Sequence, residues 1–388
     1  MGSEWRELTL GSVLRGQIRH GLYKPLEQFG SGTRVVKMGL QFSHDRIGRQ
    51  EMPRVPLSDT ERRRYLVQEG DLLFSRTSMM ADGAGKCSLV EPHDEPFVFD
   101  GNILCATPNG QVADPRFIYY YFKSARGRQA ISEIIAGTQA RSLSSTSLSA
   151  VRIVCPSLPE QRRIAGILGA LDDKIELNRR MSQTLGSLVR GYVDRALADR
   201  PMVPYGSALE VRMGAPFKGA AFSAPRNGRP LLRIRDLKTF VSGTWTTEVR
   251  ADETTIGPGD IVVGMDAEFR ATLWLGEESV LNQRVCSFRG IDGVGRAFVL
   301  SALGPDLAFQ EQAKTGTTVI HLNKADIDAF TVPELSVSEH RRLTATTEPL
   351  IELVVANSIQ NHSLIAIRDA LIARLLSNRI CVPQEVSA

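Results

Sequence analysis

Residues that could form a phosphate-binding, metal-binding or nuclease site are present in this chain, but their spacing fits none of these sites. Gly83-Ala84-Gly85-Lys86-Cys87 lacks the glycine spacing and the Ser or Thr of a P-loop. The six histidines form no pair with the spacing of metal ligands. The acidic residues Asp306 and Glu311 stand at the wrong distance from Lys314 for a nuclease motif. The pattern favours a binding protein over an enzyme.

Composition agrees with a soluble multidomain protein. The chain has 388 residues, of which 42% are hydrophobic and 23% charged, and its net charge is +4. Its five cysteines include no C-x-x-C pair, which indicates reduced, mostly buried thiols in a cytoplasm. No run of 18 apolar residues occurs, so we expect no membrane segment. The charge permits nucleic-acid binding without requiring it.

A long helix over residues 156–198 is the first element that could position a binding surface. At 1.5 Å per residue it would be about 50 Å long. Its seam positions alternate in steps of four and three residues, which is the heptad pattern of a helix packed along another helix. These positions are Ile164, Leu168, Leu171, Ile175, Asn178, Ser182, Leu185, Val189, Tyr192 and Ala196.

An internal repeat supplies the partner helix. A shift of 179 residues carries Glu160 onto Glu339, Asn178 onto Asn357 and Leu185 onto Leu364. With small gaps, the repeat extends to Gly70-Asp71-Leu72 and Gly259-Asp260-Ile261, each a turn followed by an apolar strand. The chain therefore reads as globule, helix, globule, helix.

The predicted fold class is α+β, with two repeated globular α/β domains, each followed by a long helix. The boundaries are 1–155 for the first globule, 156–198 for the first helix, 199–332 for the second globule, and 333–388 for the second helix with its tail. Each globule is expected to have a mostly β core, and the run Tyr119–Phe122 is expected to lie in the first core rather than to stack on bases.

The two helices should pair as an antiparallel coiled coil, because a whole globule separates them in sequence. If their midpoints coincide, facing residue numbers add up to roughly 540, which places Asn178 near Asn361 and Ser182 near Asn357. Such a polar layer would fix the register, and Asn178→Leu should then stabilise the pair. The alternative is that these side chains face solvent. The second helix contributes Leu350, Val354, Asn357, Asn361 and Leu364 to the seam, with Arg368 at the position that matches Val189.

The residues Leu158-Pro159-Glu160-Gln161-Arg162-Arg163-Ile164, continuing to Asn178, resemble the central conserved region of specificity subunits of Type I restriction-modification systems. The strands after Gly70-Asp71 and Gly259-Asp260 are similar to the "gate" strand of that family's two target-recognition domains. Ser336-Val337-Ser338-Glu339 departs from the Leu-Pro-Glu-Gln pattern at the start of the second helix.

This resemblance implies a non-catalytic subunit that reads a bipartite, asymmetric DNA sequence. Each globule would read one half of the double-stranded target, and the helix pair would space the two readers. The pair would also dock modification (methyltransferase) subunits, two in that family, and restriction subunits would complete the complex. The resemblance implies no cofactor in this chain, because S-adenosylmethionine and ATP belong to those partners.

Affinity for DNA comes from phosphate contacts and specificity from side chains on base edges, so basic and polar residues near the gate strands and turns are candidates for DNA contacts. Any single Arg or Lys could equally be a solvated surface charge. The candidates are Arg34, Lys37, Arg76, Thr77, Lys86, Gln139, Arg141, Arg233, Arg235, Lys238, Arg270, Gln283, Arg284, Lys314 and Thr317. The run Arg62-Arg63-Arg64 is expected to start a short helix and to contact phosphate at most.

The outer face of the helices is the expected docking surface for partner subunits. Asp172 is read as part of this solvated face, because Ile175 marks the seam. The docking candidates are Glu160, Gln161, Arg162, Arg163, Asp172, Arg179, Glu339, Arg341 and Arg342. Two other readings stay open. The chain could be a coiled-coil assembly scaffold without DNA readout, or an enzyme with an unrecognised site.

Overall fold

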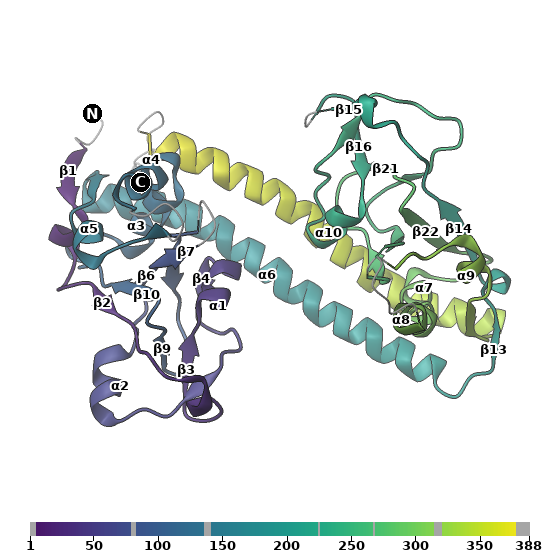
Figure 1. The fold of residues 1–388 in the computed structure, drawn as a ribbon, viewed down its shortest axis with the longest axis horizontal. Coiled ribbons are helices and arrows are strands. Elements are labelled where there is room, and N and C mark those ends of the chain that lie inside the picture. The colour runs from purple at the N-terminus through teal and green to yellow at the C-terminus, as the bar shows by residue number, and fades with distance from the viewer. Residues whose placement is uncertain are drawn as a thin grey trace, which may run out of the picture. The chain divides into compact units, whose positions relative to one another are not determined.

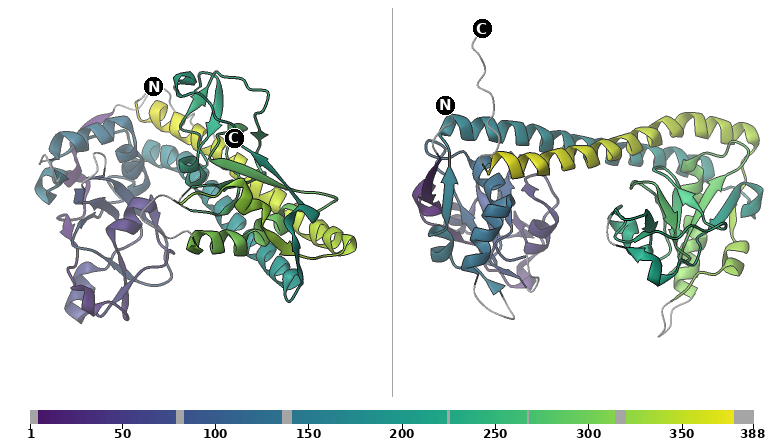
Figure 2. Two further views of the ribbon diagram at one scale, coloured as in Figure 1. Left: turned by 45° about the vertical axis from the view of Figure 1, so that its right-hand side comes forward. Right: turned by 90° about the horizontal axis from the view of Figure 1, so that it is seen from above.

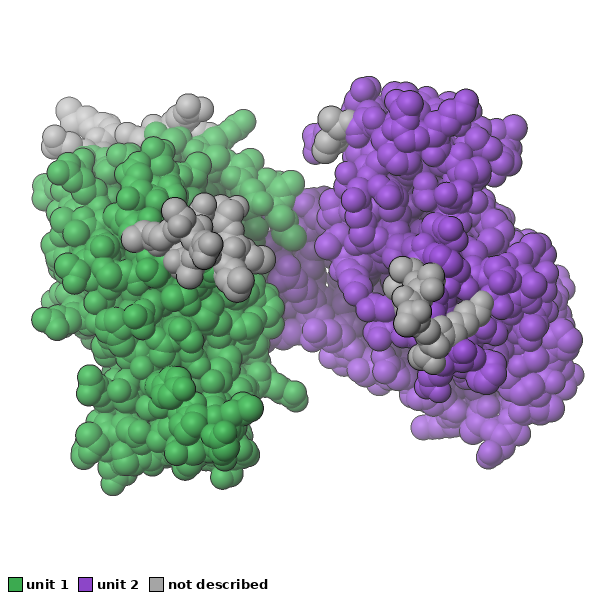
Figure 3. Space-filling model, in the orientation of Figure 1, with its two compact units in different colours: residues 1–173, 365–388 green, residues 174–364 purple. Residues whose placement is uncertain are grey.

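The computed structural model describes residues 5–78, 83–135, 141–223, 226–266, 268–313 and 320–377. The chain divides into two compact units (Figure 3). Unit 1 contains residues 1–173 and 365–388, and unit 2 contains residues 174–364. Each unit therefore holds one globular part together with segments of both long helices, α6 (Leu158–Leu197) and α10 (Val337–Leu375) (Figure 1).

The globular part of unit 1 is built from short strands and five short α-helices in its described residues. The helices are α1 (Met38–Ser43), α2 (Asp59–Tyr65), α3 (Pro115–Lys123), α4 (Ala125–Ile134) and α5 (Ser145–Ser149). The strands are β1 (Arg6–Thr9), β2 (Arg19–His20), β3 (Thr33–Val36), β4 (Arg46–Ile47), β5 (Arg54–Val55), β6 (Leu72–Ser75), β7 (Thr77–Ser78), β8 (Cys87–Val90), β9 (Phe97–Phe99), β10 (Ile103–Ala106), β11 (Arg141–Ser142) and β12 (Arg152–Cys155).

The central sheet of unit 1 has the order β2-β10-β6-β8-β4, and a smaller sheet has the order β5-β3-β9. Strands β6, β8 and β10 are buried along their whole length, which explains their continuous rather than alternating apolar sequences. Helix α3 packs against the central sheet with every residue of Phe117–Phe122 buried. The expected core position of this aromatic run is therefore confirmed.

The globular part of unit 2 repeats this arrangement. Its helices are α7 (Arg296–Ala302), α8 (Gly304–Ala313) and α9 (Lys324–Asp328). Its strands are β13 (Met202–Pro204), β14 (Leu209–Met213), β15 (Phe222–Ser223), β16 (Arg229–Leu232), β17 (Trp245–Thr246), β18 (Thr255–Ile256), β19 (Ile261–Gly264), β20 (Ala271–Leu273), β21 (Ser279–Leu281), β22 (Val285–Gly290) and β23 (Thr331–Pro333).

The sheet orders show the repeat directly. The order β14-β22-β19-β20 matches β2-β10-β6-β8, and a parallel pair, β16 with β21, matches β3 with β9. In both units a strand at the start of the globule pairs antiparallel with the strand that precedes a long helix, β1 with β12 and β13 with β23. The α+β class and the repeat that the sequence predicts are confirmed.

Helices α6 and α10 lie side by side and antiparallel (Figures 1 and 2). Most of the expected seam is buried or half-buried, but the assignment of Tyr192 to the seam is wrong. Its side chain is 44% exposed, and the next residue, Val193, is fully buried. A straight helix has 3.6 residues per turn and drifts away from a strict heptad, so the buried position has moved by one residue at this end.

By length and composition alone, one described helix, α10, could cross a membrane. A long packed helix of a soluble protein meets the same criteria. Residues Leu343, Ile351 and Val355 of α10 are buried in the core of unit 2, and Ile372 and Leu375 are buried in the core of unit 1. These five apolar side chains of α10 therefore pack against protein, whereas Leu353, Ile359 and Ile367 of the same helix are exposed.

Candidate nucleic-acid interface

The two gate strands, β6 and β19, begin with the same local structure. Gly70 and Gly259 have φ angles of 86° and 97°, a region that favours glycine. The following aspartate, Asp71 or Asp260, accepts a hydrogen bond from the backbone N–H three residues earlier, at 3.0 and 2.7 Å. This side-chain turn sets the entry of each gate strand into the sheet.

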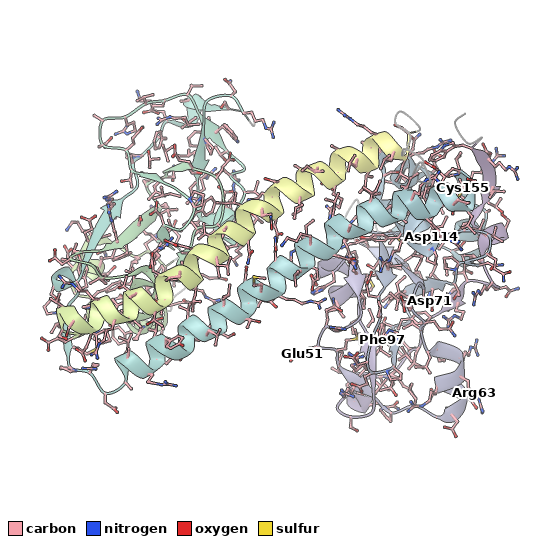
Figure 4. All side chains as sticks on the ribbon, turned by 180° about the vertical axis from the view of Figure 1, so that it is seen from behind. Glu51, Arg63, Asp71, Phe97, Asp114 and Cys155 are labelled. Carbon is pink, nitrogen blue, oxygen red and sulfur yellow. The ribbon has the colours of Figure 1, made fainter. Side chains whose placement is uncertain are left out.

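Asp71 also anchors the gate to its neighbours. It is fully buried (Figure 4), and its carboxylate accepts hydrogen bonds from Arg19 at 2.9 Å and from the Thr107 hydroxyl at 2.6 Å. Arg19 is on β2, and Thr107 directly follows β10. A paired charge of this kind holds the start of β6 firmly in the sheet, so side chains at the other end of the strand project from a rigid base.

Arg76 directly follows β6 and is exposed. Its backbone is held at both ends, because its N–H donates to Asn102 O at 2.8 Å and its C=O accepts from Leu143 N at 2.8 Å. Its guanidinium has no hydrogen-bond or ion-pair partner within the described part of the chain. Arg76 is therefore an available cation on a fixed backbone. Thr77 beside it is half-buried, and its hydroxyl lies 3.9 Å from Met38 Sδ.

The lysine candidates of unit 1 are already partnered. Lys37 forms an ion pair with Asp100 at 2.8 Å, and Lys86 donates to Phe42 O at 2.6 Å and lies 3.4 Å from Asp45. Burial alone would raise the pKa of Asp45, but the ammonium groups of Lys123 and Lys86 lower it. These lysines are therefore weaker candidates for a phosphate contact than Arg76.

Arg34 is a structural residue rather than a surface contact, which corrects its place among the DNA candidates. It lies in β3 and is only 9% exposed. Its guanidinium donates to the backbone oxygen of Glu95, lies 3.5 Å from the Glu95 carboxylate, and stands over the ring of Phe97 (Figure 4) at 5.6 Å. A basic residue type alone does not reveal burial, and this arginine holds β3 against the segment before β9.

In unit 2, Arg270 and Gln283 are the exposed candidates whose side chains make no hydrogen bond or ion pair with the residues described. Arg284 lies 3.6 Å from Asp266, and Lys238 pairs with Glu268 at 3.0 Å. The remaining two candidates also have neighbours: Arg235 donates to Thr244 at 2.7 Å, and the half-buried Arg233 stands over the ring of Phe222 at 5.7 Å.

Four candidates fall outside the described structure in whole or in part. Gln139, Lys314 and Thr317 lie outside the described residues, and for Arg141 only the backbone is described. That backbone forms the ladder of β11 with β7, in which Arg141 pairs with Ser78. The ladder brings the segment of Arg141 beside the residues that follow the gate strand.

The structure supports the arginines of α2 as candidates for phosphate contacts. Ser58 and Glu61 form a capping box that starts this helix, and Arg62, Arg63 and Arg64 occupy its last turn, all exposed. Figure 4 labels Arg63 on the outside of unit 1. The basic run was visible in the sequence, where the short helix was expected, but its exposure was not.

Three of the expected docking residues are buried, so they do not form an outer surface. Gln161 is 2% exposed and accepts from Asp114 N (Figure 4) at 2.9 Å, which ties the first turn of α6 to the N-cap of α3. Glu160 is 8% exposed and paired with Arg163. Arg162, Arg179, Arg341 and Arg342 are exposed, and Arg163 and Glu339 are half-buried.

Asp172 is the third buried docking candidate, and its assignment to a solvated face is wrong. It is 7% exposed, and its carboxylate accepts from the Tyr120 hydroxyl and from Arg368 Nη1, both at 2.7 Å. Burial and the Asp172 carboxylate raise the pKa of Tyr120, so this hydroxyl stays a donor. Burial would lower the pKa of Arg368, but its bonds to Asp172 and Asp369 raise it. Asp172 therefore joins α3, α6 and α10 within unit 1.

A polar layer joins the helices within unit 2, in the register expected from the sequence. Asn178 is fully buried, and its Nδ2 donates to Asn361 Oδ1 at 2.9 Å and to Gln360 Oε1 at 2.7 Å. Asn357 Nδ2 donates to Ser182 Oγ at 3.3 Å. The facing residue numbers add up to 539 in both pairs, so the Asn side chains do not face solvent.

No group of three or more potential metal ligands occurs among the described residues. Four cysteines, Cys87, Cys105, Cys155 and Cys286, are free and buried, and burial raises the pKa of each thiol. These groups behave as small apolar side chains, as the sequence predicts.

A family model described as "Type I restriction modification DNA specificity domain" matches residues 56–186. The EcoBI specificity subunit of Escherichia coli is 27% identical over 179 residues, which cover 45% of this chain and 38% of that protein. The HindI specificity subunit of Haemophilus influenzae is 24% identical over 195 residues, covering 48% and 39%. The matched region thus spans less than half the length of these relatives.

A crystal structure of a Type I restriction-modification system S subunit from M. genitalium has the same fold. The two structures superpose with a TM-score of 0.64 at 14% sequence identity, and the match covers 96% of each chain.

Proposed function

We propose that this chain, a member of the family of Type I restriction-modification specificity subunits, binds double-stranded DNA sequence-specifically and directs partner subunits to its target. In this proposal each globular part reads one half of a bipartite, asymmetric sequence. The observation that carries it is the duplication: two globules of one topology, each with a gate strand and each leading into a long helix. Two different readers in one chain suit an asymmetric target.

The reading residues are proposed from exposure and free hydrogen-bonding capacity. Arg76 in unit 1 and Arg270 and Gln283 in unit 2 combine both properties, and side chains of these types make bidentate contacts to guanine and adenine. Arg63 and Arg64 would add phosphate contacts, which raise affinity without specifying sequence. The exposed Arg162, Arg179, Arg341 and Arg342 would meet partner subunits.

The partners and cofactors are part of the same proposal. Two modification subunits would bind the helices and would bring S-adenosylmethionine, while restriction subunits would bring ATP-driven activity. The chain itself would perform no chemistry and would work in the cytoplasm. The division into 1–155, 156–198, 199–332 and 333–388, and the role of the helix pair in spacing the two half-sites, stay predictions from the sequence.

The test is co-expression of the full chain with its modification subunit, followed by sequencing of the methylated DNA. We expect one bipartite methylated motif. Arg76→Ala should abolish or relax methylation in one half of the motif and leave assembly with the modification subunit intact. Arg34→Ala is the matched control: it should lower the melting temperature and leave the motif unchanged wherever the protein folds.

Other results would decide against the proposal. An assembled complex that methylates no DNA, and whose DNA affinity does not fall with salt, would favour the scaffold reading. Nuclease or other activity of the isolated chain on DNA would favour an enzyme. Unchanged methylation by Arg76→Ala would remove this residue from the reading surface.

A further inference from the structure

The polar layer between α6 and α10 consists of two copies of one contact. The repeat shift of 179 residues carries Asn178 onto Asn357 and Ser182 onto Asn361. The Asn178–Asn361 and Asn357–Ser182 hydrogen bonds, at 2.9 and 3.3 Å, are therefore equivalent by the repeat. The layer has an approximate twofold symmetry that relates α6 to α10.

This symmetry means that the polar layer does not select a partner helix. If α6 met the α6 of a second copy in the same register, Asn178 would face Ser182. In a pair of two α10 helices, Asn357 would face Asn361. Both substitutes can form amide–hydroxyl or amide–amide hydrogen bonds like those in the structure. A pair of two α6 helices would lose the Asn178–Gln360 bond, because Met181 is the repeat counterpart of Gln360, but Gln360 is exposed and the buried contacts of the layer would stay paired.

The ion pair near the end of α6 does not select a partner helix either. Arg200 lies 2.7 Å from Glu339, and both side chains are partly exposed. The repeat places Glu160 at the position of Glu339, so Arg200 would again face a glutamate in a pair of two α6 helices. This contact does not distinguish the two kinds of pairing either.

The buried pair of Asp172 and Arg368 breaks the symmetry. Their side chains are 7% and 15% exposed, and the guanidinium and carboxylate are 2.7 Å apart. The repeat counterpart of Asp172 is Ile351, and that of Arg368 is Val189. Ile351 and Val189 are both buried in the apolar core of unit 2. One symmetric position is thus ionic and the other apolar.

Like-helix pairing would separate these charges. In a pair of two α6 helices, Asp172 would face Val189 at both symmetric positions, and in a pair of two α10 helices, Arg368 would face Ile351. The Tyr120 hydroxyl would still donate to Asp172, but the guanidinium of Arg368 that bonds to this carboxylate would be replaced by an apolar side chain. A buried charge without its counter-charge is strongly unfavourable, on the order of 100-fold or more in a pairing equilibrium for each charge.

We propose that the Asp172–Arg368 ion pair, and not the polar asparagine layer, determines which partner each helix accepts, and that it excludes a second copy of the same helix. The seam of α6 then fits the seam of α10 and rejects another α6. This inference concerns pairing alone and does not depend on DNA binding.

The test uses full chains with two different tags, unfolded and refolded together at high concentration so that pairing between chains competes with pairing within a chain. Native mass spectrometry then measures the fraction of mixed-tag dimers. The uncharged variant D172I/R368V copies the apolar pair of unit 2 into unit 1. The matched control D172R/R368D reverses the charges and keeps the selection. A second variant, V189R/I351D, copies the ion pair of unit 1 into unit 2, so that both symmetric positions of the seam are ionic.

We expect D172I/R368V and V189R/I351D to form mixed-tag dimers at roughly ten times the level of the wild type or more, and the charge reversal to match the wild type. Exchange of α6 and α10 between chains would raise the dimer fraction of all four proteins alike. A difference in dimer fraction between the proteins therefore reports like-helix pairing. Circular dichroism identifies which of D172I/R368V and V189R/I351D refold to the native spectrum. The proposal is overturned if a refolded variant of these two has the same dimer fraction as the wild type. A dimeric charge-reversal variant would also overturn it.

Discussion

Replacing Asn178 by leucine tests the energetics of the polar layer, and the structure changes the result expected from the sequence. The sequence alone predicts that a leucine in the seam stabilises the helix pair. In the structure Asn178 makes two hydrogen bonds, and its Oδ1 is buried without a partner. The leucine removes that unpaired atom and gains about 1.5–3 kcal/mol of apolar burial.

The losses offset this gain. Two hydrogen bonds of about 1 kcal/mol each disappear, and the buried Asn361 Oδ1 loses its donor from Asn178, which costs about 1–3 kcal/mol. Gln360 is exposed and can turn to water. We therefore expect Asn178→Leu alone to be neutral or destabilising by about 1–2 kcal/mol, whereas N178L/N361L should stabilise by about 1–3 kcal/mol because no buried amide stays unpaired.

Urea unfolding followed by circular dichroism at the helix band gives the free energies of unfolding for the wild type, both single variants and the double variant. The double-mutant cycle isolates the coupling between the two asparagines. Leu185→Met is the control for a seam substitution that keeps volume, with an expected change below about 1.5 kcal/mol. The reasoning fails if Asn178→Leu alone stabilises the protein as much as the double variant does.

Three further predictions concern buried titratable groups. Tyr120→Phe removes a hydrogen bond to a charged acceptor, Asp172, and should lower the free energy of unfolding by about 1.5–3 kcal/mol in urea titrations; an unchanged value would contradict the 2.7 Å contact. Burial lowers the pKa of His340 from 6.5, so the unfolded chain binds its proton more readily and stability should fall as the pH drops below about 6.5. That slope should disappear in His340→Phe, and a persisting slope would assign it to other groups. Burial raises the pKa of Cys155 and Cys286 to about 12, so Ellman's reagent should label them only after unfolding; rapid labelling of the native protein at either position would show that its thiol is accessible.

The scaffold could be predicted from the sequence because it depends on periodic and repeated signals. A heptad of seam positions and a constant shift of 179 residues specify two long helices, their antiparallel register and two globules of one topology. The error at Tyr192 arises from the same signal. A strict heptad assumes 3.5 residues per turn, whereas α6 has moved on by one residue at Val193 over its 40-residue length.

The role of Asp172 could not be predicted from its surroundings in the sequence. It directly follows the seam position Leu171 and stands beside Asp173 and Lys174, and a charge in such a run is usually solvated. Its partner Arg368 lies 196 residues away, at a position where the repeat expects valine. The anomaly was visible in the second helix, but only the packed helices show that two apparent exceptions compensate each other.

Candidate DNA contacts are the least predictable part, because residue type does not determine exposure. Arg34 and Arg76 are both basic residues at strands of the first globule. One is held in the interior by Glu95, and the other projects from a fixed backbone without a partner among the described residues. The difference comes from tertiary contacts, which neither periodicity nor the repeat records.

A chain with two similar helices has a specificity problem that its repeat alone does not solve. Every contact that follows the repeat is shared by the intended pair and by a pair of like helices, so symmetric hydrogen bonds such as those of Asn178 and Asn357 can set register without choosing a partner. Only a departure from the repeat can choose. A buried ion pair adds little net stability, yet separating its members is strongly unfavourable, which makes it effective for this purpose. The choice of partner helix is therefore made where the repeat fails. At that position unit 1 has the pair Asp172–Arg368 and unit 2 has the pair Ile351–Val189.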